Sequence, residues 1–483
     1  MFRPLVCALG FGLALGCKSD PPKHESPPPP PVPVKTEDPC RNAKAEGPLS
    51  WIADDYPNAL ACARQKKVPL VLDLWAPWCH TCLSMQTTVL MDKSFADDQA
   101  KFVFATLDTD RESNAPALAK LAISAWPTFY VVSSVDEVVL ARFVGAATVG
   151  EFHEFIDAGA RALINNIAAG DAHLLGAERA LAVKDYATAE TELLATLDKA
   201  PTAWLRRPSV LNSLILTKWK RFDLAGCMDI AEKYMDQTGL SAIASDFLVT
   251  AMSCADAYQP KSVRDQAGAD PVKTLRQHAV ARWQTLLADP GATLSVDDRS
   301  DAMASLRETL DALGDKAGAK TTAQAQRKLL DDAAAKATSP IAAMTFNWPR
   351  AEVYDYLKVP LELVPALEKS AKDLPKEYDP RARLGWIYLK AGKLDDAAKW
   401  TDEALALVYG PRKGKVLQLR ADIAAAAKDS AGQRKYLDLA VKLYESLPPA
   451  QQNPEVLAKT KQALIQLDAG SASGSAGSGS AAH

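Results

Sequence analysis

The chain has 483 residues, of which 48% are hydrophobic and 24% charged, and its formal net charge is −3. This length is sufficient for two or three domains, each with its own hydrophobic core. The weak negative charge provides no basic surface of the kind that a nucleic-acid partner needs, so we expect no nucleic-acid binding.

The N-terminus has the pattern of a secretory signal. Arg3 is followed by a mostly apolar run that is too short to span a bilayer, for which about 20 residues are needed. The run ends in Ala14-Leu15-Gly16-Cys17, which resembles a bacterial lipobox. The resemblance implies a lipoprotein signal peptide over residues 1–16, lipidation of Cys17, and an exported protein anchored in a membrane and facing the periplasm. An ordinary cleaved signal peptide or an uncleaved anchor is the alternative.

Residues 17–39 are predicted to form the lipidated cysteine and a linker. Prolines are unbroken from Pro27 to Pro31, a composition that favours an extended polyproline II stalk. Lys18 stands where an aspartate commonly favours the inner membrane, so the outer membrane is slightly favoured. No later segment is long and apolar enough to suggest a membrane span, and the Gly/Ser/Ala-rich residues 468–483 are expected to be a disordered tail.

Six cysteines remain beyond the predicted lipidation site. An even number in an exported chain suggests disulfide bonds, although the sequence does not fix which cysteines pair. The pairs that we favour are Cys40–Cys62, Cys79–Cys82 and Cys227–Cys254.

From Trp51 onward, apolar periodicity alternates between helix and strand. Expected helices cover 58–67, 79–91, 114–122 and 148–164, and expected strands cover 68–75, 101–107, 128–133 and 137–144, the last two joined by a hairpin loop at 134–136. This order predicts an α/β domain, a mixed sheet with flanking helices, over residues 40–165.

The segment DLWAPWCHTC, Asp73 to Cys82, places two cysteines at the junction of an expected strand and helix. Unpaired N–H groups and the positive end of the helix dipole favour a thiolate at Cys79, which we take as the nucleophile. Cys82 lies one turn further along the same face, where it can resolve a mixed disulfide. No second Cys-x-x-Cys or close histidine pair exists, so we expect no metal site, and Leu83 excludes a c-type haem. An inert structural disulfide remains open.

This segment, together with Trp126-Pro127-Thr128 and Val144-Gly145, resembles the active-site motifs of the thioredoxin fold. The resemblance covers roughly residues 48–165. It implies that Pro127 is cis and that its loop pairs with an extended substrate. It also implies that Trp78 and Trp126 are exposed aromatic residues that contact substrate, with Gly145 beside them.

The resemblance further implies that Asp73 is a buried acid that accepts a proton from Cys82. The lysine that often accompanies this acid is absent, because Thr106 appears at the matching position. His80 lies between the cysteines, where a cation would stabilise the Cys79 thiolate and make the couple less reducing than thioredoxin. The sequence leaves open whether His80 contributes to substrate binding in this way or faces solvent.

Residues 166–467 show helical periodicity with short breaks and almost no strand pattern. The stretch Arg383 to Leu407 resembles a tetratricopeptide repeat, with small residues at Gly385, Ala397 and Ala404 that let two helices approach closely. A weaker match spans Glu178 to Pro201. We therefore expect an all-α, tetratricopeptide-like solenoid, whose family commonly binds a protein or peptide.

Together these features predict an extracytoplasmic thiol–disulfide oxidoreductase without a cofactor, which exchanges disulfides with proteins and recruits a protein partner through its repeats. The alternatives are a lipid-anchored binding scaffold and a redox sensor, in which the thioredoxin-like domain is mainly structural. The sequence does not predict the direction of electron flow.

Overall fold

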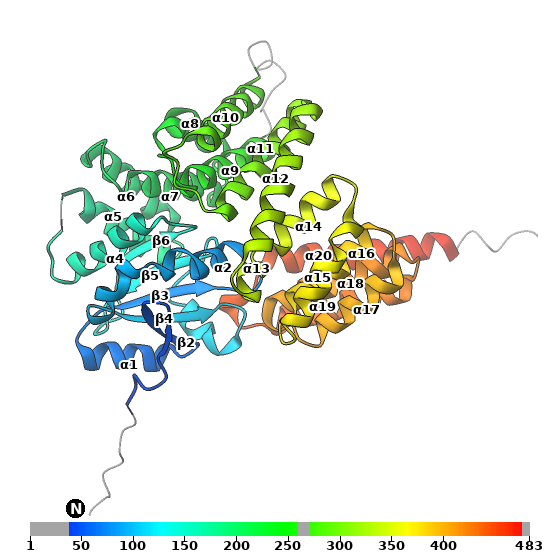
Figure 1. Cartoon of the computed structure of the whole chain (residues 1–483), viewed down its shortest axis with the longest axis horizontal. Helices are drawn as coiled ribbons and strands as arrows, with labels where there is room; N and C mark the ends of the chain where they lie inside the picture. Colours follow the sequence, from blue (N-terminus) through cyan, green and yellow to red (C-terminus); the bar gives the residue numbers. More distant parts are fainter. Residues whose placement is uncertain (1–37, 168, 259–269, 476–483) are drawn as a thin grey trace, which may run out of the picture. The chain divides into compact units, whose positions relative to one another are not determined.

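A six-stranded mixed sheet forms the centre of the N-terminal region (Figure 1). Its strand order is β1-β2-β4-β3-β5-β6. Strands β2, β4 and β3 are parallel to one another, and β1, β5 and β6 pair antiparallel to their neighbours. The strands are β1 Lys44–Glu46, β2 Leu49–Ala53, β3 Leu70–Trp75, β4 Val103–Asp108, β5 Thr128–Val132 and β6 Val139–Val144.

The predicted α/β fold class is confirmed, and the four expected strands correspond to β3 to β6. The N-terminal pair β1 and β2 was not expected. β1 is three exposed residues, Lys-Ala-Glu, with none of the β-branched or aromatic residues that indicate a strand. It is a strand because it pairs with β2, so this pairing could not be predicted from local sequence.

Helices cover both faces of the sheet. They are α1 Tyr56–Lys66, α2 His80–Thr87, α3 Ala115–Leu118 and α4 Val149–Leu163, with 3₁₀ turns η1 Val89–Met91, η2 Lys93–Ala100 and η3 Glu112–Asn114. The helix expected over 114–122 is wrong in extent, because α3 has only four residues. Tertiary hydrogen bonds hold the following chain: Ala122 donates its N–H to the Ala182 carbonyl and accepts from the Tyr130 hydroxyl.

The alternation of side chains along β3 separates two hydrophobic layers. Leu70, Leu72 and Leu74 enter the layer that contains α1, whereas Val71 enters an aromatic layer with Phe129 and the residues of α4. Asp73 is paired in register with Phe129. This alternation therefore directs a carboxylate toward the aromatic side of the sheet.

The described residues from 169 onward are mostly helical (Figure 1). The helices are α5 Ala169–Ala182, α6 Tyr186–Lys199, α7 Arg207–Lys220, α8 Leu224–Tyr234, α9 Ala242–Ala257, α10 Pro271–Ala288, α11 Val296–Leu313, α12 Lys316–Lys336, α13 Pro340–Met344, α14 Asn347–Tyr356, α15 Val364–Asp373, α16 Asp379–Lys390, α17 Leu394–Leu405, α18 Gly410–Ala426, α19 Ser430–Ser446 and α20 Pro454–Ser475. Short 3₁₀ turns are η4 Met235–Gln237, η6 Pro360–Leu363 and η7 Pro449–Gln451.

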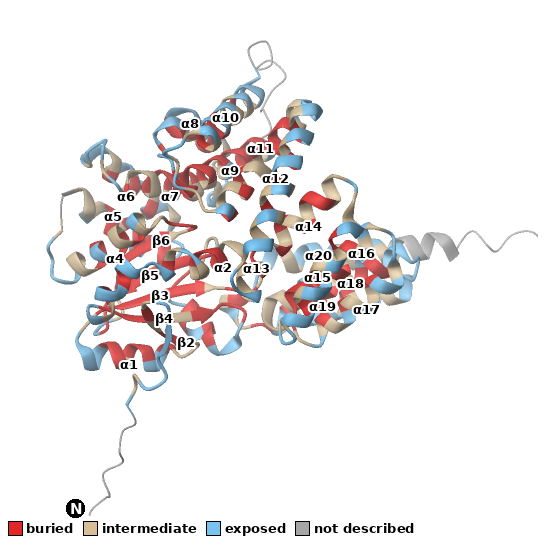
Figure 2. Ribbon diagram, viewed as in Figure 1, coloured by how far each residue is buried: buried red, intermediate tan, exposed pale blue. Residues whose placement is uncertain are grey.

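Neighbouring helices pack against each other in pairs, and buried residues lie on their facing sides (Figure 2). The clearest predicted repeat corresponds to α16 and α17, which turn at Gly392 with a positive φ of 71°. Gly385 allows the close approach of the two helices, because a Cβ there would collide with Thr401 of α17. The solenoid-like architecture of this region is therefore as expected.

Helix α20 continues to Ser475 and so includes the first residues of the disordered tail expected over 468–483, whereas residues 476–483 lie outside the described part of the chain. Alanine has the highest helix propensity, and adding residues to an existing helix costs far less than starting one. Among the described residues, no helix is both long and apolar enough to cross a bilayer.

The structure is a computed structural model that describes residues 38–167, 169–258 and 270–475. The predicted signal peptide, Cys17 and nearly all of the proline-rich linker lie outside these residues. The chain from Pro39 onward forms one compact unit, in which helices of the solenoid contact the sheet domain directly.

Candidate active site

Cys79 and Cys82 form a disulfide at the N-terminus of α2. Cys79 is the N-cap residue, and its Sγ accepts a hydrogen bond of 3.0 Å from the Cys82 backbone N–H. The chain arrives there from β3 through a short turn in which the Cys79 N–H donates to the Ala76 carbonyl. This geometry places Sγ where N–H donors and the helix dipole favour a thiolate once the bond is reduced.

Asp73 is buried on β3, with 2% of its surface exposed. One carboxylate oxygen accepts a hydrogen bond from Gln86 Nε2 at 3.1 Å, and the other has no partner. Burial raises the pKa of Asp73 to about 7, although the Gln86 hydrogen bond lowers it. Thr106 lies opposite in the register of β4, so no cation occupies the position next to Asp73 on that strand. A carboxyl of this kind can take up or release a proton near neutral pH.

The Trp126–Pro127 and Val144–Gly145 loops, which resemble active-site motifs of the thioredoxin fold, lie next to each other. The Trp126–Pro127 bond is cis, and the Pro127 carbonyl accepts a 3.0 Å hydrogen bond from the Gly145 N–H. Gly145 has a positive φ of 88° and is buried. A Cβ there would collide with the carboxylate of Asp246 from α9, so a solenoid helix lies directly against this loop.

Trp78 and Trp126 are in edge-to-face contact, with ring centroids 5.1 Å apart. Trp126 is 38% exposed and donates from Nε1 to Thr109. Trp78 is only half-buried rather than exposed, because it donates from Nε1 to Asp110 at 2.9 Å and has the Arg412 guanidinium over its ring at 4.8 Å. The expectation of two exposed tryptophans therefore holds for Trp126 and is wrong for Trp78.

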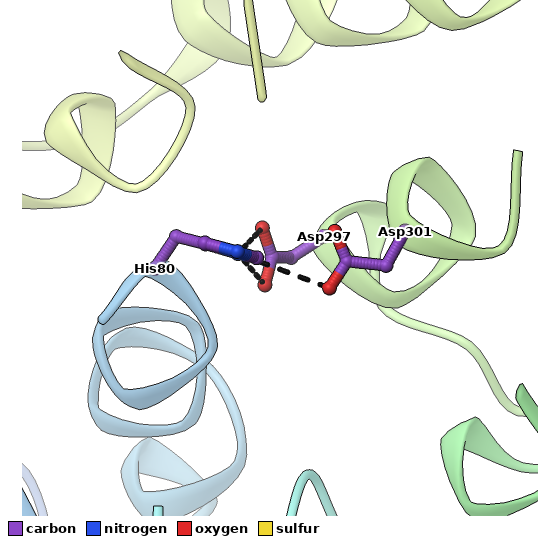
Figure 3. A group of neighbouring side chains, drawn as sticks. All are labelled: His80, Asp297 and Asp301. Carbon is purple, nitrogen blue, oxygen red and sulfur yellow. Dashed lines mark hydrogen bonds and ion pairs between the residues drawn. The ribbon is translucent and has the colours of Figure 1, made fainter. Parts of the chain in front are cut away.

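His80 does not face solvent: its Nδ1 lies 3.0 Å from both carboxylate oxygens of Asp297, in the first turn of α11 (Figure 3). Asp301 lies one turn further along α11, with its carboxylate 3.9 Å from the same nitrogen. Burial by itself lowers the pKa of His80, but the negative charges of Asp297 and Asp301 raise it to about 10. This raised pKa favours an imidazolium at His80, next to the disulfide and in contact with the solenoid.

The same three side chains offer ligand atoms within 4.8 Å of one another, which is the arrangement of a divalent-cation site. A metal would need the neutral imidazole, and the negative charge of Asp297 favours the protonated ring of His80. The ion pair explains the arrangement without a metal. Sequence reasoning missed Asp297 and Asp301, and the only local signal was the acidic first turn of α11, which contains Asp297 but not Asp301.

Solenoid helices cover much of the face that carries these motifs. Helix α13 also contacts α2, and the two lie side by side in Figure 1. The C-terminal repeats hold the loop after β4, where Tyr409 donates to Asp108 and Gln451 Nε2 donates to the carbonyls of Thr109 and Arg111. Cys79 and Cys82 are accordingly 5% and 1% exposed.

The other two disulfides lie away from this site. Cys40–Cys62 joins the segment before β1 to α1, and Cys227–Cys254 joins α8 to α9. These are the pairs that the sequence favoured. Each connects an element to its neighbour, which is the arrangement of a structural staple.

Residues 50–133 match the model of the Thioredoxin-like family, so the chain contains a thioredoxin-like domain that carries the Cys79–Cys82 pair and cis-Pro127. The match ends before Gly145, and it covers none of the solenoid.

The helical part is similar to solved repeat structures. A tetratricopeptide repeat protein from Parabacteroides merdae aligns with 12% identity and a TM-score of 0.39, over 62% of this chain and 98% of that one. BtubC from P. vanneervenii aligns with 13% identity and a TM-score of 0.30, over 48% of this chain and 92% of that one. A chain of the APC/C hetero-tetramer Cut9–Hcn1 aligns with 10% identity and a TM-score of 0.21, over 61% of this chain and 64% of that one. These scores are too low to support a functional argument.

Proposed function

We propose that the protein is a thiol–disulfide oxidoreductase that acts on proteins through Cys79 and Cys82. The observation that carries the proposal is the position of Cys79 Sγ at the N-cap of α2, bonded to Cys82 and accepting its backbone N–H. A disulfide that served only to hold the fold together would contribute little across two intervening residues, because the closed loop is so short.

In the reducing direction, two electrons pass from the cysteine pair to a substrate disulfide. The Cys79 thiolate attacks one sulfur of a substrate disulfide, forms a mixed disulfide and releases the other substrate sulfur as a thiolate. Cys82 transfers its proton to the Asp73 carboxylate and attacks Cys79 Sγ, which releases the second substrate thiolate. The Cys79–Cys82 bond forms as the substrate gains two electrons, and oxidation of a substrate dithiol is the exact reverse in electron flow. His80 contributes a positive charge that stabilises the Cys79 thiolate.

The proposal extends to location and partners. The lipobox-like Ala14-to-Cys17 segment supports an exported protein that is anchored by lipid and faces the periplasm. The paired helices of the solenoid support recruitment of a protein or peptide partner, which would raise the local concentration of substrate at Cys79. No cofactor is needed for this chemistry.

One observation favours a second function, that of a binding scaffold or redox sensor. Both cysteines are buried, and solenoid residues lie against Gly145 and His80, where a relative of this fold would meet its substrate. In a scaffold the Cys79–Cys82 bond would stay oxidised, whereas in a sensor it would change state without turnover of a substrate. In both cases the solenoid surface would bind the partner.

A redox titration of the full chain, read by thiol alkylation and mass, separates the two. The oxidoreductase predicts one reversible two-electron couple that disappears in C79S and remains in a C227S/C254S control. A potential near −270 mV would make the protein a reductant and one near −120 mV an oxidant. A Cys79–Cys82 bond that glutathione and dithiothreitol buffers do not reduce in the folded protein would rule out the enzyme and leave the scaffold.

A further inference from the structure

A cavity of about 870 Å³ lies between the thioredoxin-like domain and the solenoid. Trp78 and Trp126 form part of its wall, together with the α5–α6 turn, the start of α18 and the segment from η7 to α20. Its volume lies near the upper end of the range of roughly 300–1,000 Å³ that is typical of ligand pockets. Trp78 directly precedes Cys79, so a molecule in this cavity would lie beside the disulfide without covering it.

The lining of this cavity carries four cations. Lys184 is in the α5–α6 turn, Lys220 ends α7, and Arg412 and Lys415 belong to α18. Within the described part of the chain, none of the three lysines has a carboxylate oxygen within 4 Å, and Arg412 contacts the Trp78 ring with its Nε unpartnered. The three lysines therefore give the cavity positive charge that no ion pair among the described residues neutralises, whereas Asp379 and Asp110 partly offset the charge of Arg412.

Nearby acids do not cancel this charge. Asp110 accepts a hydrogen bond from Trp78, and burial together with Asp108 raises the pKa of Asp110 to about 7, so it is close to half-protonated at neutral pH. Glu455 is engaged by Lys459 at 2.7 Å. Partial desolvation in the cavity wall and the charge of Lys184 lower the pKa of Lys220, which shows that cations repel one another here. An incoming anion would relieve this repulsion.

The arrangement of the cations points to an extended ligand. They come from three separate elements around the cavity rather than converging on one point, as they would around a single phosphate or carboxylate. Apolar surface lies between them, including Trp126, which is 38% exposed, and Val183, which is 68% exposed. The chemistry that fits is a chain with several carboxylates and apolar side chains among them.

We propose that this cavity binds an acidic peptide segment of the protein substrate, next to the disulfide that exchanges with Cys79–Cys82. The inference rests on the proposed function, because it names the class of substrate for that site. The carboxylates pair with Lys184, Lys220 and Lys415, and an apolar side chain packs on Trp126. Arg412 holds the Trp78 ring in place against Trp126.

The test is fluorescence anisotropy with a short fluorescein-labelled peptide of alternating glutamate and leucine, added to the full chain. The binding variant is K184Q/K220Q/K415Q. Its matched control is K273Q/K320Q/K372Q, in which three exposed lysines on α10, α12 and α15 lose the same charge far from the cavity lining. All six substitutions are at exposed positions, so both proteins should fold.

We expect salt-sensitive binding that is weakened about tenfold or more in the binding variant and unchanged in the control, since three charge pairs are lost. The glutamine-leucine analogue should bind at least tenfold more weakly than the glutamate peptide. Equal binding by the two triple variants, or by the two peptides, would overturn the proposal. Displacement by inorganic phosphate at the same concentration of charge would also overturn it, because the cavity would then be a site for small anions.

Repeating the measurement in C79S/C82S separates this inference from the proposed function. Peptide binding should persist in that variant, because neither cysteine lines the cavity. A protein that binds the peptide but shows no redox couple would refute the oxidoreductase and retain the binding site. A protein with a working couple and no peptide binding would refute only the site.

Discussion

The ion pair between His80 and Asp297 connects the Cys79–Cys82 helix to the solenoid. The substitution D297N removes this pair and should show how much it contributes to the free energy of unfolding. The Asp297 carboxylate is 1% exposed and the His80 ring 22%, and Nδ1 lies 3.0 Å from the carboxylate. The ordinary pKa of histidine, 6.5, is raised here to about 10. At about 1.36 kcal/mol per pKa unit, this difference corresponds to about 5 kcal/mol in favour of the folded state with a protonated ring.

The loss in D297N should be smaller than that figure. The imidazole can release its proton when its partner is gone, Asp301 remains nearby, and solvent screens a partly exposed ring. We therefore expect D297N to lower the free energy of unfolding by about 2–4 kcal/mol at pH 6. Because the folded pKa lies above the unfolded one, this stabilisation is complete below pH 6.5 and is lost as pH rises through about 10.

Urea unfolding followed by tryptophan fluorescence at pH 6, 7.5 and 9.5 measures this directly. The matched control is D395N, because Asp395 is an exposed acid in the first turn of α17 and shares the helix-end position of Asp297 without its ion pair. The control should change stability by less than about 1 kcal/mol. A loss in D297N that equals the control, or that does not shrink between pH 6 and 9.5, would refute the reasoning.

Three further predictions concern the buried Asp73, the α16–α17 helix pair and the Cys40–Cys62 disulfide. D73N should leave stability unchanged near pH 4 and raise it by about 2 kcal/mol at pH 8, as measured by urea unfolding at each pH. The pKa of Asp73 in the folded protein is raised to about 7, so the protein with Asp73 loses stability as the pH rises toward that value. G385A should destabilise by about 2–3 kcal/mol in thermal unfolding, since its Cβ would collide with a threonine of α17, whereas G150A, with open space around its Cβ, should be neutral or slightly stabilising. Replacing both Cys40 and Cys62 with serine should cost about 3 kcal/mol in urea unfolding under non-reducing conditions, and a loss below 1 kcal/mol would show that the staple does not constrain the unfolded chain.

Much of the fold could be predicted from local sequence patterns. The apolar strands β3 to β6 lie within two residues of their expected positions, because burial on both faces demands continuous β-branched and apolar residues. The turn at Gly392 and the small residues of α16 and α17 identified a helix pair, since close helix packing admits few side chains. The resemblance to the thioredoxin fold rested on the same kind of local signal, a Cys-x-x-Cys at a helix start.

What the sequence could not predict depends on contacts between distant segments. Asp297 is 217 residues from His80, and no periodicity in either segment indicates that they meet. The same holds for Arg412 over Trp78 and for Asp246 against Gly145. Sequence by itself determined the Cys79–Cys82 pair and the elements that present it, because those depend on local geometry. Only the tertiary structure decided that the solenoid covers this pair and lines an open cationic cavity beside it, because burial and charge at a site depend on which remote helices pack there.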